Sequence, residues 1–143
     1  MAINEHPPMG TILRCKFDTG FRVPEMVKVR PVVVISPKIS VRHRLCTVVP
    51  ISGEAPQPKM PYHYELTNID PPLPPPYEDG PNWVKGDMVV SVSFERLDFL
   101  RYGKDRSGKR IYRYEVLPVD DIRAIRACIL NSLGLAVLTK HLP

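Results

Sequence analysis

The sequence has few cysteines and no long apolar run. Its three cysteines, Cys15, Cys46 and Cys128, are odd in number, widely spaced and set among apolar neighbours. Such cysteines are typical of reduced packing residues and argue against a disulfide framework or a metal site. The first ten residues contain no apolar core of signal-peptide length, and no segment approaches the roughly 18 apolar residues of a membrane span. We therefore expect a soluble, cytoplasmic protein that does not interact with membranes.

Several motifs that carry chemistry are also missing. The glycines match neither of the two phosphate-cradling motifs, and no G-x-S-x-G segment occurs. The histidines are not spaced to pair with Cys, Asp or Glu as metal ligands. These absences argue against a metal-dependent or acyl-transfer enzyme, and we expect neither a metal nor another cofactor.

Proline and charge, in contrast, are unevenly distributed. Ten of the 17 prolines lie between Pro50 and Pro81, and residues 70–81 ("DPPLPPPYEDGP") predict an extended, polyproline-like loop. This loop is either a stiff surface connector or a ligand for a partner domain. Residues 1–50 carry a net charge of +5, residues 51–100 of −5 and residues 101–143 of +5. The basic ends indicate either a surface for a polyanion or ordinary solvated side chains.

The hydrophobic pattern predicts a single domain, residues 1–143, that is rich in strands. A terminal helix is predicted at about residues 120–133, with Asp120 or Asp121 as its cap and Gly134 as its stop. Its apolar residues Ile122, Ile125, Ile129 and Leu133 are expected on one stripe. The fold class is therefore α+β and β-rich, a small curved sheet or a partly open barrel. The predicted strands are residues 11–17, 32–35, 45–51, 61–67, 83–94 and 110–117.

Arg30 stands at an unusually rigid position. It precedes Pro31, which fixes its own backbone and restricts the residue before it. The apolar run Val32–Ile35 follows and predicts a short strand that is buried on both faces. Arg30 either acts in a site at the mouth of this strand or forms a structural ion pair with Glu25 or Asp87.

Other polar residues also lie at strand ends. Ser52 closes the third strand, and Lys85 and Asp87 are spaced to project from the same face of the 83–94 strand. Glu25 lies in the loop before Arg30, so a curled sheet would bring all five side chains to one groove. Each has a simpler alternative: Ser52 as a turn residue, Asp87 as part of a bulge and Lys85 as a solvated charge.

Four short segments follow one another in a distinctive order: "GTILRCKFDTGF", "PEMVKVRPVVVISP", "LCTVVPIS" and "WVKGDMVVSVSFERLD". This order, over residues 10–98 and more loosely the terminal helix, resembles the PemK/MazF family of toxins from bacterial toxin–antitoxin pairs. The resemblance implies a small SH3-like, partly open β-barrel with a C-terminal helix, assembled as a homodimer. It also implies a metal-independent endoribonuclease that cleaves single-stranded RNA and is suppressed by a cognate antitoxin protein.

The resemblance also assigns roles to residues. Arg30 matches the family's catalytic arginine, Ser52 the Ser/Thr after "P-I", and Asp87 an acidic residue used in some members. Lys85 stands where those members have an arginine, and Glu25 matches a loop glutamate, although the preceding His of some members is Pro24 here. The residues expected to bind RNA are Arg14, Lys16, Lys28 and Arg96, the last of which matches a recurrent arginine that could also serve only the fold.

The implied chemistry accounts for these residue types. The ribose 2′-OH attacks the adjacent phosphate, which leaves a 2′,3′-cyclic phosphate and a 5′-OH. A guanidinium such as that of Arg30 can hold two oxygens of the phosphorane at once. Asp87 or Glu25 would accept the 2′-OH proton, and Lys85 or Arg30 would protonate the leaving oxygen. Residues 18–29 would form a loop that gates access to the site.

Two other functions fit the same sequence. One is a non-catalytic toxin on the same barrel, similar to the gyrase poisons of a sibling branch. The other is an RNA-binding module without toxicity. Retention of Arg30, Ser52 and Asp87 favours catalysis, whereas the long proline loop and the missing loop histidine favour another role.

Overall fold

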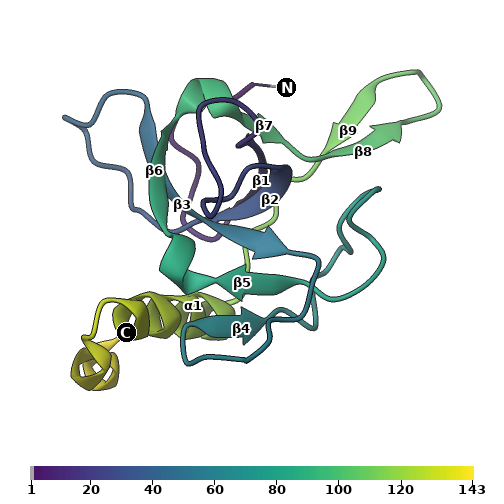
Figure 1. Ribbon diagram of the computed structural model, residues 1–143. Helices are drawn as coiled ribbons and strands as arrows, with labels where there is room; N and C mark the ends of the chain where they lie inside the picture. Colours follow the sequence, from purple (N-terminus) through teal and green to yellow (C-terminus); the bar gives the residue numbers. More distant parts are fainter. Residues whose placement is uncertain (1) are drawn as a thin grey trace.

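The computed structural model describes residues 2–143 and contains one curved, antiparallel seven-stranded sheet. The strand order is β4-β5-β3-β2-β1-β7, and β6 pairs with β3 beside β5 (Figure 1). The sheet remains open, so the predicted β-rich α+β class with a partly open barrel is confirmed. Its strands are β1 (Ile12–Lys16), β2 (Val29–Val34), β3 (Leu45–Ser52), β4 (His63–Glu65), β5 (Trp83–Lys85), β6 (Val90–Ser93) and β7 (Leu97–Phe99).

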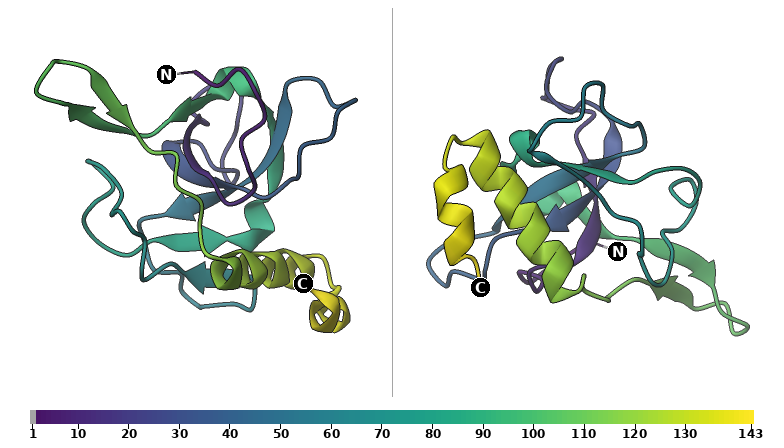
Figure 2. Two further views of the ribbon diagram at one scale, coloured as in Figure 1. Left: turned by 180° about the vertical axis from the view of Figure 1, so that it is seen from behind. Right: turned by 90° about the horizontal axis from the view of Figure 1, so that it is seen from below.

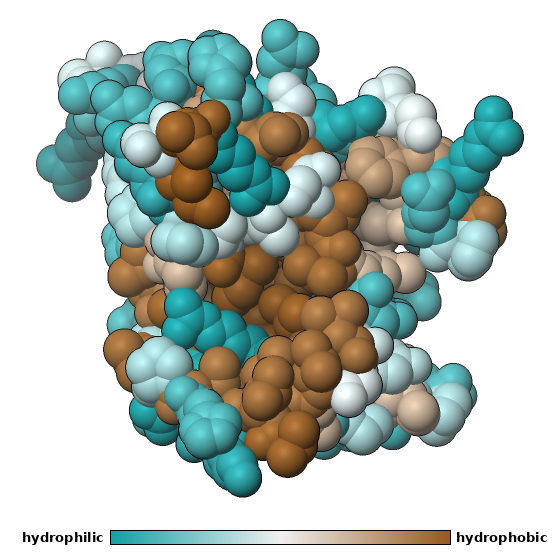
Figure 3. All heavy atoms as spheres, turned by 90° about the vertical axis from the view of Figure 1, so that its left-hand side faces the viewer, coloured by the Kyte–Doolittle hydropathy of each residue, from teal (hydrophilic) through white to brown (hydrophobic). Residues whose placement is uncertain are grey.

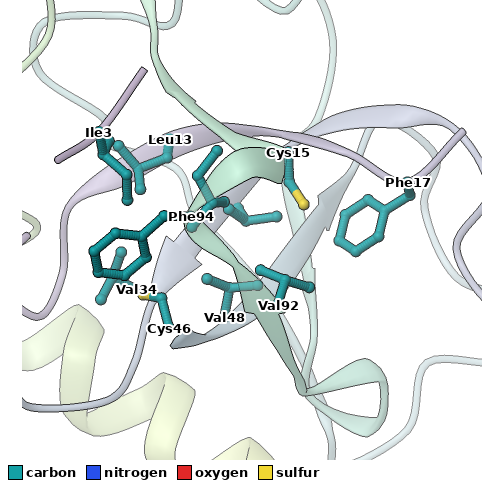
Figure 4. Packing of buried hydrophobic residues seen from close by; sticks show 11 residues of the cluster. Ile3, Leu13, Cys15, Phe17, Val34, Cys46, Val48, Val92 and Phe94 are labelled. Atoms are coloured by element: carbon teal, nitrogen blue, oxygen red, sulfur yellow. The ribbon is translucent and has the colours of Figure 1, made fainter. Parts of the chain in front are cut away.

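Both faces of the central strands are buried. Along β2, Val32 and Val34 pack into one apolar cluster, whereas Val33 between them packs into a second. This alternation follows from the two-residue period of a strand, and it confirms the predicted strand buried on both sides. The strand begins earlier, at Val29, and ends at Val34, so Ile35 lies just beyond it and is half-buried. The first cluster gathers under β6 and β7 (Figure 4). The second lies on the face covered by α1.

The 83–94 segment is not one continuous strand. Val84 pairs with Ile51 and Val90 pairs with Val48, so two residues of β3 face five residues of the segment. The excess is taken up by a 3₁₀ turn, η1 (Gly86–Met88), between β5 and β6. The expectation that Lys85 and Asp87 share a strand face is therefore wrong, because Asp87 lies in this turn.

Pro50 lies in a central strand, although a proline, which lacks the N–H, is usually found in a sheet only at an edge or at a bulge. The strand β3 pairs with β2 on one side and with both β6 and β5 on the other. Pro50 falls between Val48, the last residue paired with β6, and Ile51, the first paired with β5. A residue without a donor is tolerated there because the ladder changes partners at that point.

The terminal helix α1 (Val119–Ser132) covers the second cluster through Ile122, Ile125 and Ile129 (Figure 2). Its position agrees with the predicted 120–133, and Gly134 follows with a positive φ of 74°. Leu133 was expected on the same stripe but is 61% exposed. A further 3₁₀ helix, η3 (Ala136–His141), follows α1.

The predicted aspartate cap is absent. The residue before the helix is Pro118, and its first turn receives no side-chain cap. Asp121 instead accepts a 2.6 Å hydrogen bond from the hydroxyl of Tyr64 in β4. Burial and this bond raise the pKa of Tyr64 to about 12. The carboxylate therefore joins the helix to the sheet. Within residues 2–143, no helix is long and apolar enough to cross a membrane.

A separate hairpin projects from the sheet. It consists of β8 (Arg101–Lys104) and β9 (Arg110–Tyr112), which pair only with each other (Figure 1). The predicted 110–117 strand is therefore too long. β9 pairs with β8 only as far as Tyr112, and beyond it Val116 forms an isolated bridge with Thr11. Between them, Arg113 points into the interior, where it is 1% exposed.

Candidate functional site

Arg30 is fixed by contacts on several sides. Its backbone pairs with Cys15 of β1, and its Nε donates a 2.8 Å hydrogen bond to the carbonyl oxygen of Ile51 in β3. Its guanidinium carbon lies 5.1 Å from the centre of the Tyr77 ring. Burial lowers the pKa of Arg30, while Tyr77 and Glu54 oppose that shift. An arginine remains protonated near neutral pH, so the site holds a fixed cation.

The terminal nitrogens of Arg30 are free for another partner. Within residues 2–143 they donate no hydrogen bond, and Arg30 forms no ion pair. The alternative of a structural ion pair with Glu25 or Asp87 is therefore not realised. A half-buried guanidinium with two unused nitrogens is suited to hold two oxygens of an anion.

A pocket of about 410 Å³ surrounds this guanidinium, and we call it the Arg30 pocket. Three of the residues predicted for the site or for RNA, namely Glu25, Lys28 and Ser52, line it together with Arg30. The convergence results from the adjacent ends of β2 and β3, which bring the 25–30 segment beside the turn after β3. The lining residues are Glu25, Met26, Val27, Lys28, Arg30, Ser52, Gly53, Glu54 and Met88.

Ser52 and Glu54 form the turn that closes one side of the Arg30 pocket. The Ser52 hydroxyl accepts a 3.2 Å hydrogen bond from the backbone N–H of Glu54. Ser52 is therefore a turn residue, which was the simpler alternative for it, and it also lines the Arg30 pocket. Glu54 brings a carboxylate whose charge acts on Arg30. Glu54 was not among the residues predicted for the site, although its position two residues after Ser52 was the available signal.

Glu25 is held within its own loop. Its Oε1 accepts a 3.0 Å hydrogen bond from the backbone N–H of Arg22, and its own N–H donates to the Arg22 carbonyl. These bonds fold residues 22–25 into a turn beside the Arg30 pocket. One oxygen of the carboxylate is used in this way, and the other has no partner among residues 2–143.

Asp87 and Lys85 lie outside the Arg30 pocket. Asp87 lines an adjoining pocket of about 530 Å³, which shares Glu25, Met26 and Met88 with the first. Lys85 lines neither pocket and pairs across the sheet with His63. Burial lowers the pKa of His63, with Asp87 opposing and Lys85 adding to the effect. Asp87 therefore borders the site from the next pocket.

The other predicted RNA-binding residues lie around β1. Arg14 and Lys16 form ion pairs of 3.4 and 3.6 Å with the carboxylate of Asp98 in β7. Arg96 donates 2.8 Å hydrogen bonds to the carbonyl oxygens of Lys16 and Thr19. The guanidinium of Arg96 also packs on the Phe21 ring at 4.7 Å. Arg96 thus fixes the end of β1 and the following loop, which is the fold-only alternative stated for it.

The proline-rich loop is part of the site. Its Leu73 is buried, and its Tyr77 packs against the second core cluster with the Arg30 guanidinium over the ring. The buried Arg113 donates hydrogen bonds to the carbonyl oxygens of Asp70 and Pro71. The loop is therefore more than a surface connector. The sequence did not indicate this role, because Tyr77 lies 47 positions from Arg30.

The sequence of this chain matches the family model of the PemK-like, MazF-like toxin of type II toxin–antitoxin systems over residues 9–133. The chain belongs to this toxin family. It is 31% identical over 152 residues to the uncharacterized protein YifN of Escherichia coli K12, and the alignment covers 94% of this chain and 96% of that protein. It is also 31% identical to an uncharacterized Haemophilus influenzae protein, over 96% of this chain and 98% of that one.

Solved structures of MazF-type proteins share this fold. The MazF crystal structure from Deinococcus radiodurans superposes with a TM-score of 0.59 and 21% identity, covering 92% of this chain and 99% of that one. An endoribonuclease in complex with its cognate antitoxin, from a mycobacterial species, gives a TM-score of 0.56 and 17% identity, with 90% and 96% covered. The family model confirms the membership implied by the four sequence segments, and these structures show the shared fold.

Proposed function

We propose that this PemK/MazF-like toxin is a metal-independent endoribonuclease that cleaves single-stranded RNA at the Arg30 pocket. The observation that carries the proposal is the guanidinium of Arg30, which is fixed by the Ile51 carbonyl and Tyr77 and keeps two nitrogens free. Membership of the toxin family and the fold shared with MazF endoribonucleases support the same activity.

Arg30 acts on the charge that develops during cleavage. The ribose 2′-oxygen attacks the adjacent phosphorus, the bond from phosphorus to the 5′-oxygen breaks, and the products are a 2′,3′-cyclic phosphate and a 5′-OH. The pentacoordinate intermediate carries more negative charge than the substrate, and Arg30 binds two of its oxygens. Preorganised charge of this kind contributes about 3 to 4 kcal/mol, or two to three decades in rate.

The remaining steps are two proton transfers. A carboxylate takes the proton of the 2′-OH, and the candidates are Glu25 and Glu54 in the Arg30 pocket and Asp87 in the adjoining pocket. A cationic side chain supplies a proton to the leaving 5′-oxygen, either directly or through one water molecule. The candidates are Lys28, which lines the Arg30 pocket, and Lys85, which lies outside it. Separate Glu25→Gln, Glu54→Gln and Asp87→Asn variants identify the base, because only its loss removes the acidic limb of the pH–rate profile.

The assembly implied by the family is also part of the proposal. We propose that the protein forms a homodimer and that an antitoxin protein suppresses it by occupying the Arg30 pocket. Figure 3 shows apolar side chains gathered on one face of the molecule. A hollow of about 340 Å³ between the sheet and α1 supports a dimer contact, since it is lined mainly by the apolar residues Ile35, Val89, Ile129, Leu130 and Leu142. Sedimentation of the purified protein tests the dimer.

The activity is tested with a long single-stranded RNA and its DNA counterpart, both incubated with the protein in EDTA. The proposal predicts discrete RNA fragments and intact DNA, because only RNA carries the attacking 2′-OH. Arg30→Ala should slow cleavage about 100- to 1000-fold. Arg123→Ala is the matched control, since Arg123 is exposed on α1 and bonds only to the carbonyl of Pro143. Intact RNA from folded protein that still arrests growth would favour a non-catalytic toxin.

A further inference from the structure

The projecting hairpin of β8 and β9 is strongly basic. Residues 101–112 carry five cationic side chains and one acidic one, and all six are exposed. The acidic residue, Asp105, is used inside the turn, where its carboxylate accepts hydrogen bonds from the backbone of Ser107 and Lys109. The Ser107 hydroxyl also donates a 2.7 Å hydrogen bond to this carboxylate, and this bond, together with those from the backbone, lowers the pKa of Asp105. The cationic residues are Arg101, Lys104, Arg106, Lys109 and Arg110.

A pocket of about 420 Å³ lies where this hairpin meets the sheet. Arg14 and Arg101 bring cations to it, and Asp98 brings one carboxylate, which is paired with Arg14. The prolines 74–76 and the rings of Tyr77 and Phe99 form apolar walls. Flat apolar walls with cations at the rim suit an unpaired nucleotide, whose base stacks while its phosphate meets a positive charge.

One side chain, Tyr77, links this pocket to Arg30. The Tyr77 ring lines the 420 Å³ pocket and also lies under the Arg30 guanidinium. The loop that carries Tyr77 is fixed to the hairpin, because the hydroxyl of Tyr102 in β8 donates a 2.8 Å hydrogen bond to the carbonyl of Pro72. Arg113, just after β9, binds the Tyr102 hydroxyl at 3.0 Å. Tyr77 and the loop that carries it therefore lie between Arg30 and the base of the hairpin.

We propose that single-stranded RNA extends from the Arg30 pocket across Tyr77 and along the basic hairpin, whose cations bind the phosphates flanking the cleaved bond. This inference deepens the proposed function and rests on it for the location of the cleaved bond. The hairpin exposes five cations but only one large apolar side chain, Ile111. Interfaces between proteins depend on a few anchors, mostly aromatic residues and arginine, that are buried in fitted pockets, whereas phosphate contacts need only exposed cations. Five exposed cations therefore favour RNA over an acidic peptide.

The test compares two doubly substituted proteins that each lose two lysine charges. The first, Lys104→Gln/Lys109→Gln, alters the hairpin. The matched control, Lys38→Gln/Lys140→Gln, alters exposed lysines in the 35–44 turn and in η3, both remote from the hairpin (Figure 1). Binding is measured by fluorescence anisotropy with 2′-O-methyl RNAs of about 5 and about 15 nucleotides. These RNAs lack the attacking hydroxyl, so the result does not depend on cleavage.

The hairpin variant should bind the longer RNA on the order of tenfold more weakly than wild type, and the loss should grow with RNA length. The slope of log affinity against log salt concentration should become shallower by about 1.4 for this variant. Each phosphate contact contributes about 0.7 to that slope for a single strand, and the variant loses two contacts. The control should match wild type. The inference would be overturned if the two variants bound RNA with equal affinity. It would also be overturned if the hairpin variant bound RNA like wild type and lost affinity only for an acidic peptide such as poly-glutamate. If RNA is bound through the hairpin but not cleaved in EDTA, the proposed activity fails and the binding surface stands.

Discussion

Substitution of Tyr77 tests how the proline loop acts on Arg30. Tyr77→Leu keeps an apolar side chain against the second core cluster but removes the aromatic face under the guanidinium. Tyr77→Phe keeps that face and removes only the hydroxyl, whose hydrogen bond to the Val29 carbonyl is long at 3.5 Å. The two variants therefore separate the ring from the hydroxyl.

The expected magnitude follows from the geometry of Arg30. A guanidinium carbon 5.1 Å from the ring centre is within the range of a cation–π interaction, which contributes about 1 kcal/mol at a partly exposed site. The hydrogen bond from Arg30 to the Ile51 carbonyl remains in both variants. If that interaction orients Arg30 for the transition state, Tyr77→Leu should slow the chemical step about fivefold, and Tyr77→Phe should differ little from wild type.

The assay is single-turnover cleavage at saturating RNA, so that weaker substrate binding does not lower the measured rate. Tyr114→Leu is the control, because Tyr114 is exposed, packs its ring against Phe99 at a 59° tilt and does not line the Arg30 pocket. A wild-type rate for Tyr77→Leu would refute the positioning role. A rate for Tyr77→Phe as low as that for Tyr77→Leu would refute the assignment to the aromatic ring.

Three further predictions concern stability. Gly86→Ala should lower the free energy of unfolding by about 1–3 kcal/mol in urea titrations, because the new Cβ would lie 2.8 Å from Cys128 Cβ. Gly53→Ala should change the free energy of unfolding by less than about 0.5 kcal/mol, because the nearest atom to the new Cβ, an Arg30 nitrogen, would lie 3.6 Å away. Arg113→Met should cost about 1–3 kcal/mol because the Asp70 and Pro71 carbonyls lose their donor, and limited proteolysis should then cut residues 70–77 faster. Finally, stability should fall as the pH rises from about 9 to 11, because burial raises the pKa of Cys15 to about 12 and that of Cys46 to about 11.

The sign of the alkaline effect follows from proton binding. The unfolded thiols lose their protons near a pKa of 9.0, before the folded ones do, so stability present below that pH is lost above it. Urea titrations over this range measure the slope, and Cys15→Ala should flatten it. A slope that is unchanged in Cys15→Ala would contradict the assignment, and equal stabilities of Gly86→Ala and Gly53→Ala would contradict the close approach of α1 to η1.

Local patterns predicted the elements with strong periodicity. The β-branched run Val32–Ile35 and the isoleucine stripe of α1 specify burial by themselves, so the buried strand and the helix were found at nearly their observed positions. The failures concern pairing partners. Nothing in the segment "WVKGDMVVSVSF" shows that its two halves, β5 and β6, pair with different parts of β3. Because they do, the residues between them form η1 outside the sheet, and Asp87 does not share a strand face with Lys85.

The site was predicted to the extent that neighbouring strand ends define it. Arg30, Ser52 and Glu25 converge because β2 and β3 are adjacent and the loop leads directly into β2. Tyr77 could not be found in this way, because it reaches Arg30 through a loop without periodicity that is held by Arg113. Contacts between a loop and a distant strand depend on tertiary packing, which local spacing does not encode.

The most direct test of the central claim is the chemical identity of the RNA ends produced in EDTA, determined by mass spectrometry. Attack by the 2′-OH at the Arg30 pocket predicts 2′,3′-cyclic phosphate and 5′-OH ends. It also predicts that a single 2′-deoxy substitution at a mapped cleavage position abolishes cleavage there, and that Arg30→Ala yields almost no such ends. Fragments with 5′-phosphate ends, or cleavage that requires added divalent metal, would contradict the claim.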